Sequence, residues 1–381
     1  MNEFFVELYS EEIPPNLQIN VRKEFEDRIR ISLIDENIKF KKIFSYSSPT
    51  RLVIHVIGVV DKIKISSKVI KGPKVGVIED ILNNFLRSNN ASKKALFKKK
   101  IDKGEFYFIK TLPKELFAKD LLIKILLNII SSFKWKKSMK WSNHSMIWGR
   151  PLRSILAIYN NNHLSFNFGH LRSTENAIIE KDLLVKTKKV KNFKDYENFL
   201  KKNNVFFNQK EREQKIIKKL EQICKSRNYN NVFNNRLIEE VTNIVEDPNV
   251  LLLEFDKKYL EIPPEIIIST LELHQKYFPL FDNKNKLTNN FCVVANKPDT
   301  NNIIKDGNQR VVEARLSDAK FFWNKDKSRN LIKQLANLRK ITFYEKLGSI
   351  YDKTQRLRKL SSWLSDEINI NKEKVEIAAS I

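Results

Sequence analysis

The stretch that decides the fold runs from Glu261 to Asp326; it begins EIPPEIIISTLELHQKYFPLF and ends GNQRVVEARLSDAKFFWNKD. Pro263 and Pro264 predict the start of a helix, since proline at the first helical position gives up an amide that would have no partner there. The residues after this helix predict a hairpin, with strands at Tyr277–Phe281 and Phe291–Ala295 around a polar turn. The stretch therefore combines helix with antiparallel strand.

A second helix is predicted at the end of this stretch. Four apolar residues recur at offsets of four, three and four, which predicts one buried stripe. They are Val312, Leu316, Ala319 and Trp323. Arg310 lies on the opposite face, and Arg315 and Asp318 are spaced to form an ion pair on the flank. Such an arginine is either an ordinary ion-pair partner or is held to meet an RNA phosphate, and both interpretations stay open.

Outward from this stretch, the amino-terminal part of the chain predicts further strands and helices. Strands are expected at Phe4–Tyr9, Phe40–Ser47, Arg51–Val60, Glu105–Thr111, Leu152–Tyr159 and Leu164–Phe168. Helices are expected after Pro14 and Pro15, where Leu17, Val21, Phe25 and Ile29 recur, at Lys114–Phe133, and through most of Lys181–Ser226. The alternation within Arg51–Val60 is typical of a sheet with one buried face.

After Lys325 the strand signals stop, and the remaining segments predict helices. We therefore expect an α+β fold, with an N-terminal mixed α/β region of antiparallel sheets followed by the start of an all-helical domain. The expected domains are residues 1–335, with a possible subdomain boundary near 165–180, and residues 336–381. A chain of 381 residues is too long for one typical core.

Composition favours a folded protein of the cytoplasm. Hydrophobic residues make up 41% of the chain, yet no run of about 18 apolar residues is present to span a membrane. The first residues, MNEFFVELYS, lack the basic start of a signal peptide. Cys224 and Cys292 are too few for a disulfide scaffold and have no metal-ligand spacing, so we expect a reducing compartment.

The charge is strongly positive, with 70 basic against 45 acidic residues and a net charge of +25. A polyanion such as RNA is one explanation. Codon bias toward Lys, Asn and Ile is the other, and both explanations stay open.

The six lysines of Ala91–Lys103, around Leu96 and Phe97, either follow a phosphate backbone or form a solvated surface. Trp135, Trp141 and Trp148 alternate with basic residues, which fits either RNA stacking or core packing.

No motif for chemistry is found. The chain lacks a phosphate-binding glycine loop, a dinucleotide fingerprint and a zinc-binding His-Glu-x-x-His. Glu11 and Glu12 could serve catalysis or bind magnesium, but acids at a strand end beside a helix start are explained by local electrostatics. We therefore assign no catalytic, cofactor-binding or metal-binding residue.

Several segments, in order along the chain, resemble the beta subunit of bacterial glycyl-tRNA synthetase of the alpha/beta type. They are VELYSEEIPP (6–15), SSPTRLVIHV (47–56), KGPKV (71–75), MKWSNHSMIWGRPLRSILAIY (139–159), EEVTNIVEDP (239–248), the opening stretch with NFCVVANKPD (290–299), and FYEKLGSIYDKTQRL (343–357). The resemblance spans essentially the whole chain. The chain departs from the family pattern in two places. It reads GHLRSTENAIIEK where the family has a Gly-His-Arg-Phe element. It also ends at Ile381, before the family's remaining helical and anticodon-binding domains. A fragment and a reduced subunit are both compatible with this.

The resemblance implies a B3/B4-like N-terminal region and an HD-like helical domain, of which the part present holds no histidine. It implies that the chain contributes tRNA binding to the attachment of glycine to tRNA(Gly), in a complex of two alpha and two beta chains. The alpha subunit would form the adenylate and use ATP and Mg, with no cofactor on this chain. A non-catalytic RNA-binding module is the alternative. The candidate RNA contacts are Arg150, Arg310 and Arg315, since a planar guanidinium can hold phosphate bidentately and A/T-rich codons do not favour arginine.

Overall fold

A computed structural model describes residues 2–65, 67–89, 91–101, 104–110, 114–181, 183–230 and 232–381. Its contacts divide the chain into two compact units. The first comprises Met1–Gln222, Phe233–Val250 and Val294–Pro298, and the second comprises Ile223–Val232, Leu251–Val293 and Asp299–Ile381. The domain limits expected at residue 335 and near 165–180 stay predictions.

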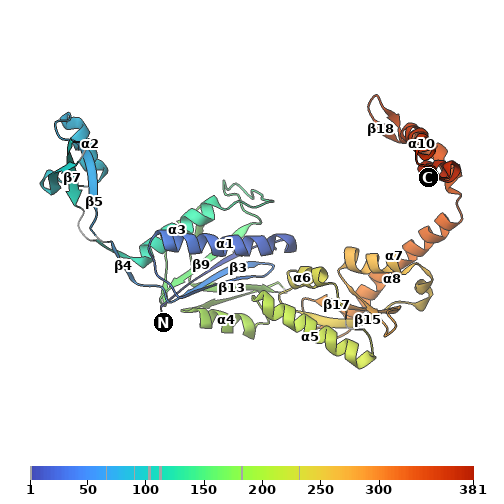
Figure 1. Ribbon diagram of the computed structural model, residues 1–381. Helices are drawn as coiled ribbons and strands as arrows, with labels where there is room; N and C mark the ends of the chain where they lie inside the picture. The colour runs from blue at the N-terminus through green and yellow to red at the C-terminus, as the bar shows by residue number, and fades with distance from the viewer. Residues whose placement is uncertain are drawn as a thin grey trace. The chain divides into compact units, whose positions relative to one another are not determined.

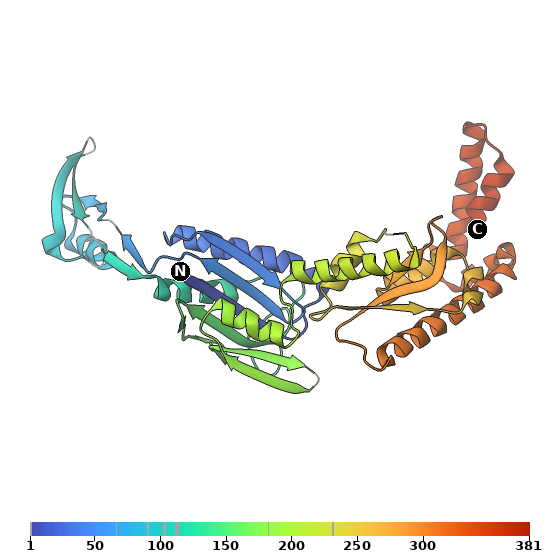
Figure 2. The ribbon, with the colours of Figure 1, turned by 90° about the horizontal axis from the view of Figure 1, so that it is seen from below.

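The first unit is built on a five-stranded sheet, seen from below in Figure 2. Its strands are β1 (Glu3–Ser10), β2 (Lys42–Ser47), β3 (Arg51–Ile57), β9 (Leu152–Tyr159) and β10 (Asn162–His163). They lie in the order β10-β9-β1-β3-β2, and each neighbouring pair is antiparallel. In the middle of the sheet, Val6 of β1 is paired with Ile54 on one side and Ala157 on the other. The predicted antiparallel sheet is confirmed.

Helices pack on one side of this sheet, as Figure 1 shows for α1 (Pro15–Asp35) and α3 (Ala118–Ser132). The expected stripe of α1 is buried, with Phe25 and Ile29 fully inaccessible in the larger core. On the other side lie α4 (Phe193–Lys202) and residues of the strand β13 (Asn176–Lys181), which forms a hairpin with β14 (Leu184–Lys189). Strand β14 falls within Lys181–Ser226, where the sequence predicts mostly helix.

The sheet is consequently buried on both faces, and the expectation of one buried face is wrong. Ile54 and Val56 of β3 belong to the core under α1, whereas Val53 packs with Phe5 into a second core under α4. His55 is also covered, with its ring stacked on Phe193 at 3.9 Å between centroids. Alternation along one strand cannot reveal a second layer that is supplied by residues more than a hundred positions later.

Several small sheets complete the first unit. The three-stranded sheet consists of β5 (Val69–Lys74), β7 (Gly104–Lys110) and β6 (Leu96–Ile101), in that order. A helix, α2 (Glu79–Ser88), and a short 3-10 turn (Lys93–Ala95) lie between β5 and β6 along the chain. The helix expected from Lys114 begins only at Ala118, because Lys114–Phe117 forms strand β8 and pairs with β4 (Lys62–Ile65). The remaining elements are β11 (Asn167–Phe168), β12 (Leu171–Arg172), α5 (Gln209–Arg227) and α6 (Asn235–Thr242).

The second unit holds most of a three-stranded sheet of β15 (Asn249–Glu254), β17 (Leu287–Ala295) and β16 (Phe278–Phe281). As predicted, Pro264 begins a helix, α7 (Pro264–Ser269), which continues as one π-helical turn (Thr270–Gln275). The predicted hairpin is confirmed as β16 and β17. Tyr277 stacks on Phe291 in the core of this unit, at 5.6 Å between ring centroids.

The helix α8 (Ile303–Lys327) buries only part of the predicted stripe. Val312 and Leu316 are fully buried in the core of the second unit, and Ala319 packs against it. Trp323 is only half-buried and lies outside that core, so its predicted burial is wrong. The core beneath α8 ends one turn earlier than the apolar pattern does.

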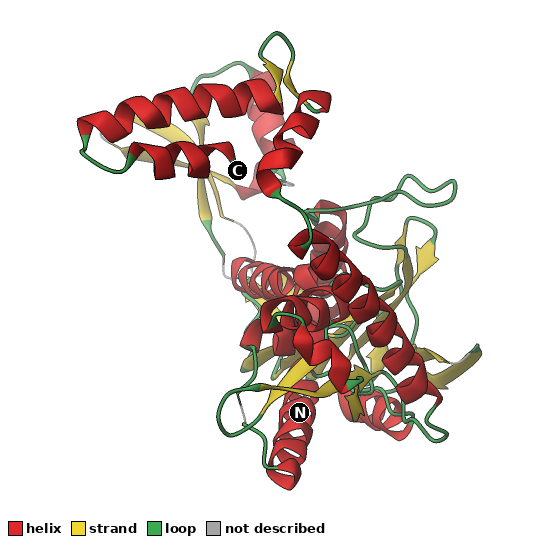
Figure 3. Cartoon of the chain, turned by 90° about the vertical axis from the view of Figure 1, so that its right-hand side faces the viewer, coloured by secondary structure: helices red, strands yellow, loops and turns green. Residues whose placement is uncertain are grey.

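The carboxy-terminal region is mainly helical, as predicted, with α10 (Ile350–Glu367) and α11 (Lys372–Ser380) running side by side in Figure 3. A short helix α9 (Leu331–Gln334) and a 3-10 turn (Leu335–Lys340) precede them. A small hairpin, β18 (Thr342–Tyr344) and β19 (Gly348–Ser349), falls where no strand is predicted. In the described part of the chain, no helix has the length and apolar character needed to span a membrane.

The burial difference along α8 leads to a stability prediction. Leu316→Ala should lower the free energy of unfolding by roughly 2–5 kcal/mol, because it opens a cavity in a filled core. Trp323→Ala should cost clearly less, although it removes a larger side chain. Urea unfolding followed by circular dichroism measures both variants. An equal or larger loss for Trp323→Ala would contradict the assigned core limit.

Candidate functional site

The three arginines singled out from the sequence do not form one cluster within either unit. Arg150 belongs to the first unit, where its Nε donates to the carbonyl of Glu12 at 3.2 Å. Arg310 and Arg315 belong to the second unit and are exposed on α8. Among the described residues, Arg315 and Asp318 form no ion pair, in contrast to their predicted pairing. Both α8 arginines are exposed, and Arg310 Nε donates to the carbonyl of Asp306 at 3.3 Å. RNA contact by all three arginines stays a prediction.

The tryptophans placed among basic residues serve the core instead of an RNA surface. Trp135 and Trp148 are 8% and 1% exposed, and their rings meet edge to face at 5.1 Å. Gly149 packs beneath them, since a Cβ there would come within 2.3 Å of the Trp135 ring. Only Trp141 stays half-buried against this core. Of the two open interpretations, the structure supports core packing for Trp135 and Trp148.

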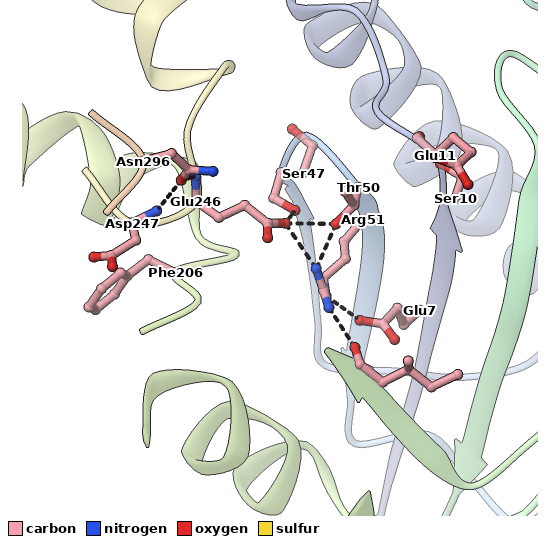
Figure 4. Close-up of polar contacts among 12 residues, drawn as sticks. Glu7, Ser10, Glu11, Ser47, Thr50, Arg51, Phe206, Glu246, Asp247 and Asn296 are labelled. Atoms are coloured by element: carbon pink, nitrogen blue, oxygen red, sulfur yellow. Dashed lines mark hydrogen bonds and ion pairs between the residues drawn. The ribbon is translucent and has the colours of Figure 1, made fainter. Parts of the chain in front are cut away.

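The most densely connected polar site lies at one end of the five-stranded sheet and centres on Arg51 (Figure 4). This side chain is 1% exposed, although it begins strand β3. Its Nε lies 3.0 Å from a carboxylate oxygen of Glu7 on β1, and its Nη1 lies 2.9 Å from one of Glu246. Its Nη2 donates to the carbonyl of Ile178 at 2.6 Å. One guanidinium thus connects two strands with two later segments.

Glu246 is held in the charged form by its surroundings. Burial opposes its ionisation, but Arg51 and the hydroxyl groups of Ser48 and Thr50 outweigh burial, so the pKa of Glu246 is lowered. The two hydroxyls donate to the same carboxylate oxygen, at 2.5 Å and 2.8 Å. The backbone amide of Glu246 donates to Asn296 Oδ1 at 2.8 Å. One carboxylate oxygen of Glu246, Oε1, is therefore used by the fold, since Ser48, Thr50 and Arg51 all donate to it.

The pKa of Glu7 is shifted in the opposite direction to that of Glu246. Burial raises the pKa of Glu7, and the opposing effects of Arg51 and of a hydrogen bond donated by the Tyr196 hydroxyl only partly offset it. Burial together with the Glu7 charge also raises the pKa of Tyr196 well above its usual range. The two carboxylates beside Arg51 thus differ in how readily they ionise, and Glu246 is the principal counter-ion.

A second buried arginine, Arg212 on α5, ties loops to the same end of the sheet. It is fully buried and donates to three backbone carbonyls, those of Thr242 at 3.0 Å, Phe206 at 2.6 Å and Ser47 at 2.9 Å. Burial lowers the pKa of Arg212 to about 10, and Glu246 offsets this only in part. Its role is to satisfy carbonyl groups that would otherwise be buried without a donor.

A pocket of about 90 Å³ opens beside this cluster. Its polar lining includes Glu12, Thr50, Glu180, Lys181, Glu246 and Asn296. Lys181 is paired with Asp247 at 3.0 Å, and Glu180 is paired with Arg153. Within the described ranges, no three His, Cys, Asp or Glu side chains are grouped so that they could hold a metal ion. Apart from Glu12, the charged side chains that line the pocket are used in ion pairs. This arrangement orders the fold, and we assign it no catalytic role.

Sequence reasoning did not single out Arg51, Arg212 or Glu246. A signal was present for Arg51, because an arginine that opens the apolar run RLVIHVI of a strand must find buried partners. No comparable signal marks Arg212, which lies in a helix rich in lysine and glutamate. Its burial becomes visible only when its contacts with Ser47 and Thr242 are known.

Comparisons with known proteins agree on one family. A family model described as "Glycyl-tRNA synthetase beta subunit" matches residues 4–381. The chain is 36% identical over 366 residues to the glycine–tRNA ligase beta subunit of Rickettsia felis, covering 95% of this chain and 55% of that protein. It is 35% identical to those of Rickettsia canadensis and Rickettsia prowazekii, covering 96% of this chain and 55% of each. The chain spans about half the length of the curated relatives that it matches. These matches confirm the resemblance that the motifs indicate.

The Arg51 cluster predicts a large difference between two equivalent substitutions. Arg51→Met leaves two buried carboxylates without their cation and should cost about 3–5 kcal/mol of unfolding free energy. Arg30→Met removes a partly exposed pair with Glu26 at 2.6 Å, and such helix pairs contribute about 0.2–0.5 kcal/mol. Chemical denaturation of both variants provides the comparison. Equal losses would show that the Arg51 charge is not required by the fold.

The lowered pKa of Glu246 predicts acid sensitivity. A carboxyl group whose pKa is lower in the folded than in the unfolded state stabilises the fold above its ordinary value of 4.5, and this stabilisation is lost as the pH falls through the folded value. The parent should therefore lose stability below that pH more steeply than Glu246→Gln does. Melting temperatures from pH 7 down to pH 3 test this, and parallel curves would contradict it.

Proposed function

Because this chain belongs to the glycyl-tRNA synthetase beta subunit family, we propose that it acts as the beta subunit of a glycine–tRNA ligase and contributes tRNA binding. The match over residues 4–381 is the observation that carries this proposal. The reaction would be the ATP-dependent attachment of glycine to tRNA(Gly) in the cytoplasm. The chain's part in it would be to bind and orient the RNA.

The proposal assigns the chemistry to a separate alpha subunit, with two alpha and two beta chains in the complex. Adenylate formation, with its ATP and Mg, would take place on that alpha subunit. The polar cluster around Arg51 supports this division, since its charged groups are engaged with one another and not directed at a ligand.

Surface charge supports the RNA-binding part of the proposal. The net charge of +25 gives a long-range attraction for a polyanion. Arg310 and Arg315 are exposed on α8, so their planar guanidinium groups are available for phosphate oxygens. Arg150 is half-exposed, with part of its guanidinium held by backbone carbonyls. The α8 arginines are consequently the stronger of the three candidates.

We expect no adenylate formation by this chain alone. Glycine-dependent pyrophosphate exchange with the purified chain should stay at background, and the alpha subunit should restore it. Alpha subunit without this chain is the control for its own exchange activity. Clear exchange by the purified chain would contradict the proposed division of labour.

We also expect tRNA binding to depend on particular arginines. Arg310→Ala and Arg315→Ala should each weaken binding of tRNA(Gly) and lower the slope of log K against log salt by about one for each phosphate that is no longer neutralised. Arg358→Ala is a matched control, because Arg358 is already paired with Glu376 at 2.8 Å. Filter binding with tRNA(Gly) and an unrelated tRNA at several salt concentrations measures these effects. Equal affinity for both RNAs, with no variant differing from the parent, would favour codon bias as the origin of the charge.

A further inference from the structure

The small sheet of β5, β7 and β6 presents one face with an unusual combination of side chains. Cross-strand neighbours point to the same side of a sheet, and the register places Lys71, Phe108 and Phe97 in one row. Lys74, Phe106 and Lys99 form the next row on the same side. We call these six residues the lysine–phenylalanine face.

Two aromatic rings of this face are stacked on one another; that of Phe97 is accessible, whereas that of Phe108 is buried. Phe97 and Phe108 stack with centroids 5.8 Å apart and an interplanar angle of 24°. Phe97 is 40% exposed, and Phe106 is half-buried. The ammonium group of Lys71 lies over the Phe106 ring, 3.8 Å from its centroid. Lys71 thus covers the Phe106 ring, whereas the exposed Phe97 ring on the same face is a platform on which a base can stack.

The charges of this face have one sign. Lys71, Lys74 and Lys99 are exposed on it, whereas Glu105 is paired in register with Lys100 and so points to the opposite side. Glu79, at the start of α2, is engaged by Lys93 at 2.6 Å. Residues 69–110 contain ten basic and four acidic residues in sequence. Neither of the two rows that make up the face contains a carboxylate that could pair with its lysines.

The opposite side of the sheet is the side that folds against the rest of this segment. Ile70, Leu96 and Ile109 share a row there, with Ile109 only 1% exposed. Phe85 of α2 lies against Gly72 of β5, where a Cβ would come within 2.7 Å of its ring. At β5 the lysine–phenylalanine face is therefore the more exposed side, whereas β6 is exposed on both sides.

We propose that the lysine–phenylalanine face binds unpaired nucleotides of RNA, an assignment that rests on the proposed RNA-binding role of the chain. A base would stack on Phe97, and the lysines would contact the flanking phosphates. Residues two apart in a strand are about 7 Å apart, so Phe97 and Lys99 on β6 can serve a base and a neighbouring phosphate. A partner recognised by charge alone would leave the exposed ring of Phe97 unused.

Adjacent lysines of β6 provide the matched test. Lys99 belongs to the face, whereas Lys98 points to the other side, 6.0 Å from the Tyr107 ring. Lys98→Glu and Lys99→Glu change the net charge equally, so general electrostatics cannot separate them. The probe is a fluorescein-labelled, unstructured RNA of about eight nucleotides, titrated into the full chain, with a blunt RNA duplex and tRNA(Gly) alongside.

We expect Lys99→Glu to weaken binding of the unpaired RNA about tenfold or more, and Lys98→Glu to weaken it far less. Phe97→Leu keeps the charge but removes the flat ring, and should weaken binding roughly five- to hundredfold, the range for loss of one stacked base. The duplex should bind less tightly than the unpaired RNA and be insensitive to Phe97→Leu. Unchanged thermal unfolding of each variant shows that the fold is retained.

Equal effects of the two lysine substitutions, together with parent-like binding by Phe97→Leu, would overturn the assignment of this face. If the same variants bind tRNA(Gly) as the parent does, the proposed function stands and only the surface is wrong. If the parent chain itself fails to bind tRNA(Gly), the proposed function fails before the surface is tested.

Discussion

A buried guanidinium is the constraint on which the first unit depends. Arg51 is almost inaccessible, and removal of such a charge from water costs several kcal/mol unless partners replace the solvent. Those partners are Glu7 on the neighbouring strand, Glu246 from a segment 195 residues later, and a backbone carbonyl on β13. The requirement to satisfy one cation therefore fixes the positions of segments that are distant in sequence.

This use of charge separates two populations of basic residues. Arg51 and Arg212 are buried and serve the fold, and the tryptophans that stand among lysines in the sequence mostly serve the core. The basic residues available to a partner are those left exposed, such as Arg310, Arg315 and the lysines beside Phe97. The chain belongs to a family of tRNA synthetase subunits, and RNA is a polyanion that suits these exposed cations. Both proposals rest on this combination.

Local rules predicted much of the fold. The proline pair at the start of α7 and the alternating strands near the amino terminus give strong signals, and the elements they predict are present. The burial of individual side chains depends on tertiary contacts that the sequence patterns do not show. Val53 is buried because a second layer covers its face, and Trp323 is half-exposed because the core beneath α8 ends at Ala319. The family could be predicted from sequence motifs. The Arg51 site could not, because it is formed by contacts between residues far apart in the chain.

The central claim is that this chain completes a glycine–tRNA ligase by binding RNA while a separate alpha subunit performs the chemistry. Its most direct test is reconstitution: the purified chain is mixed with the alpha subunit, capture of one by the other is confirmed, and glycylation of tRNA(Gly) is measured. The account predicts glycylation by the mixture and only background with either protein alone. A complex that forms but attaches no glycine to tRNA(Gly), or full activity of the alpha subunit without this chain, would contradict it.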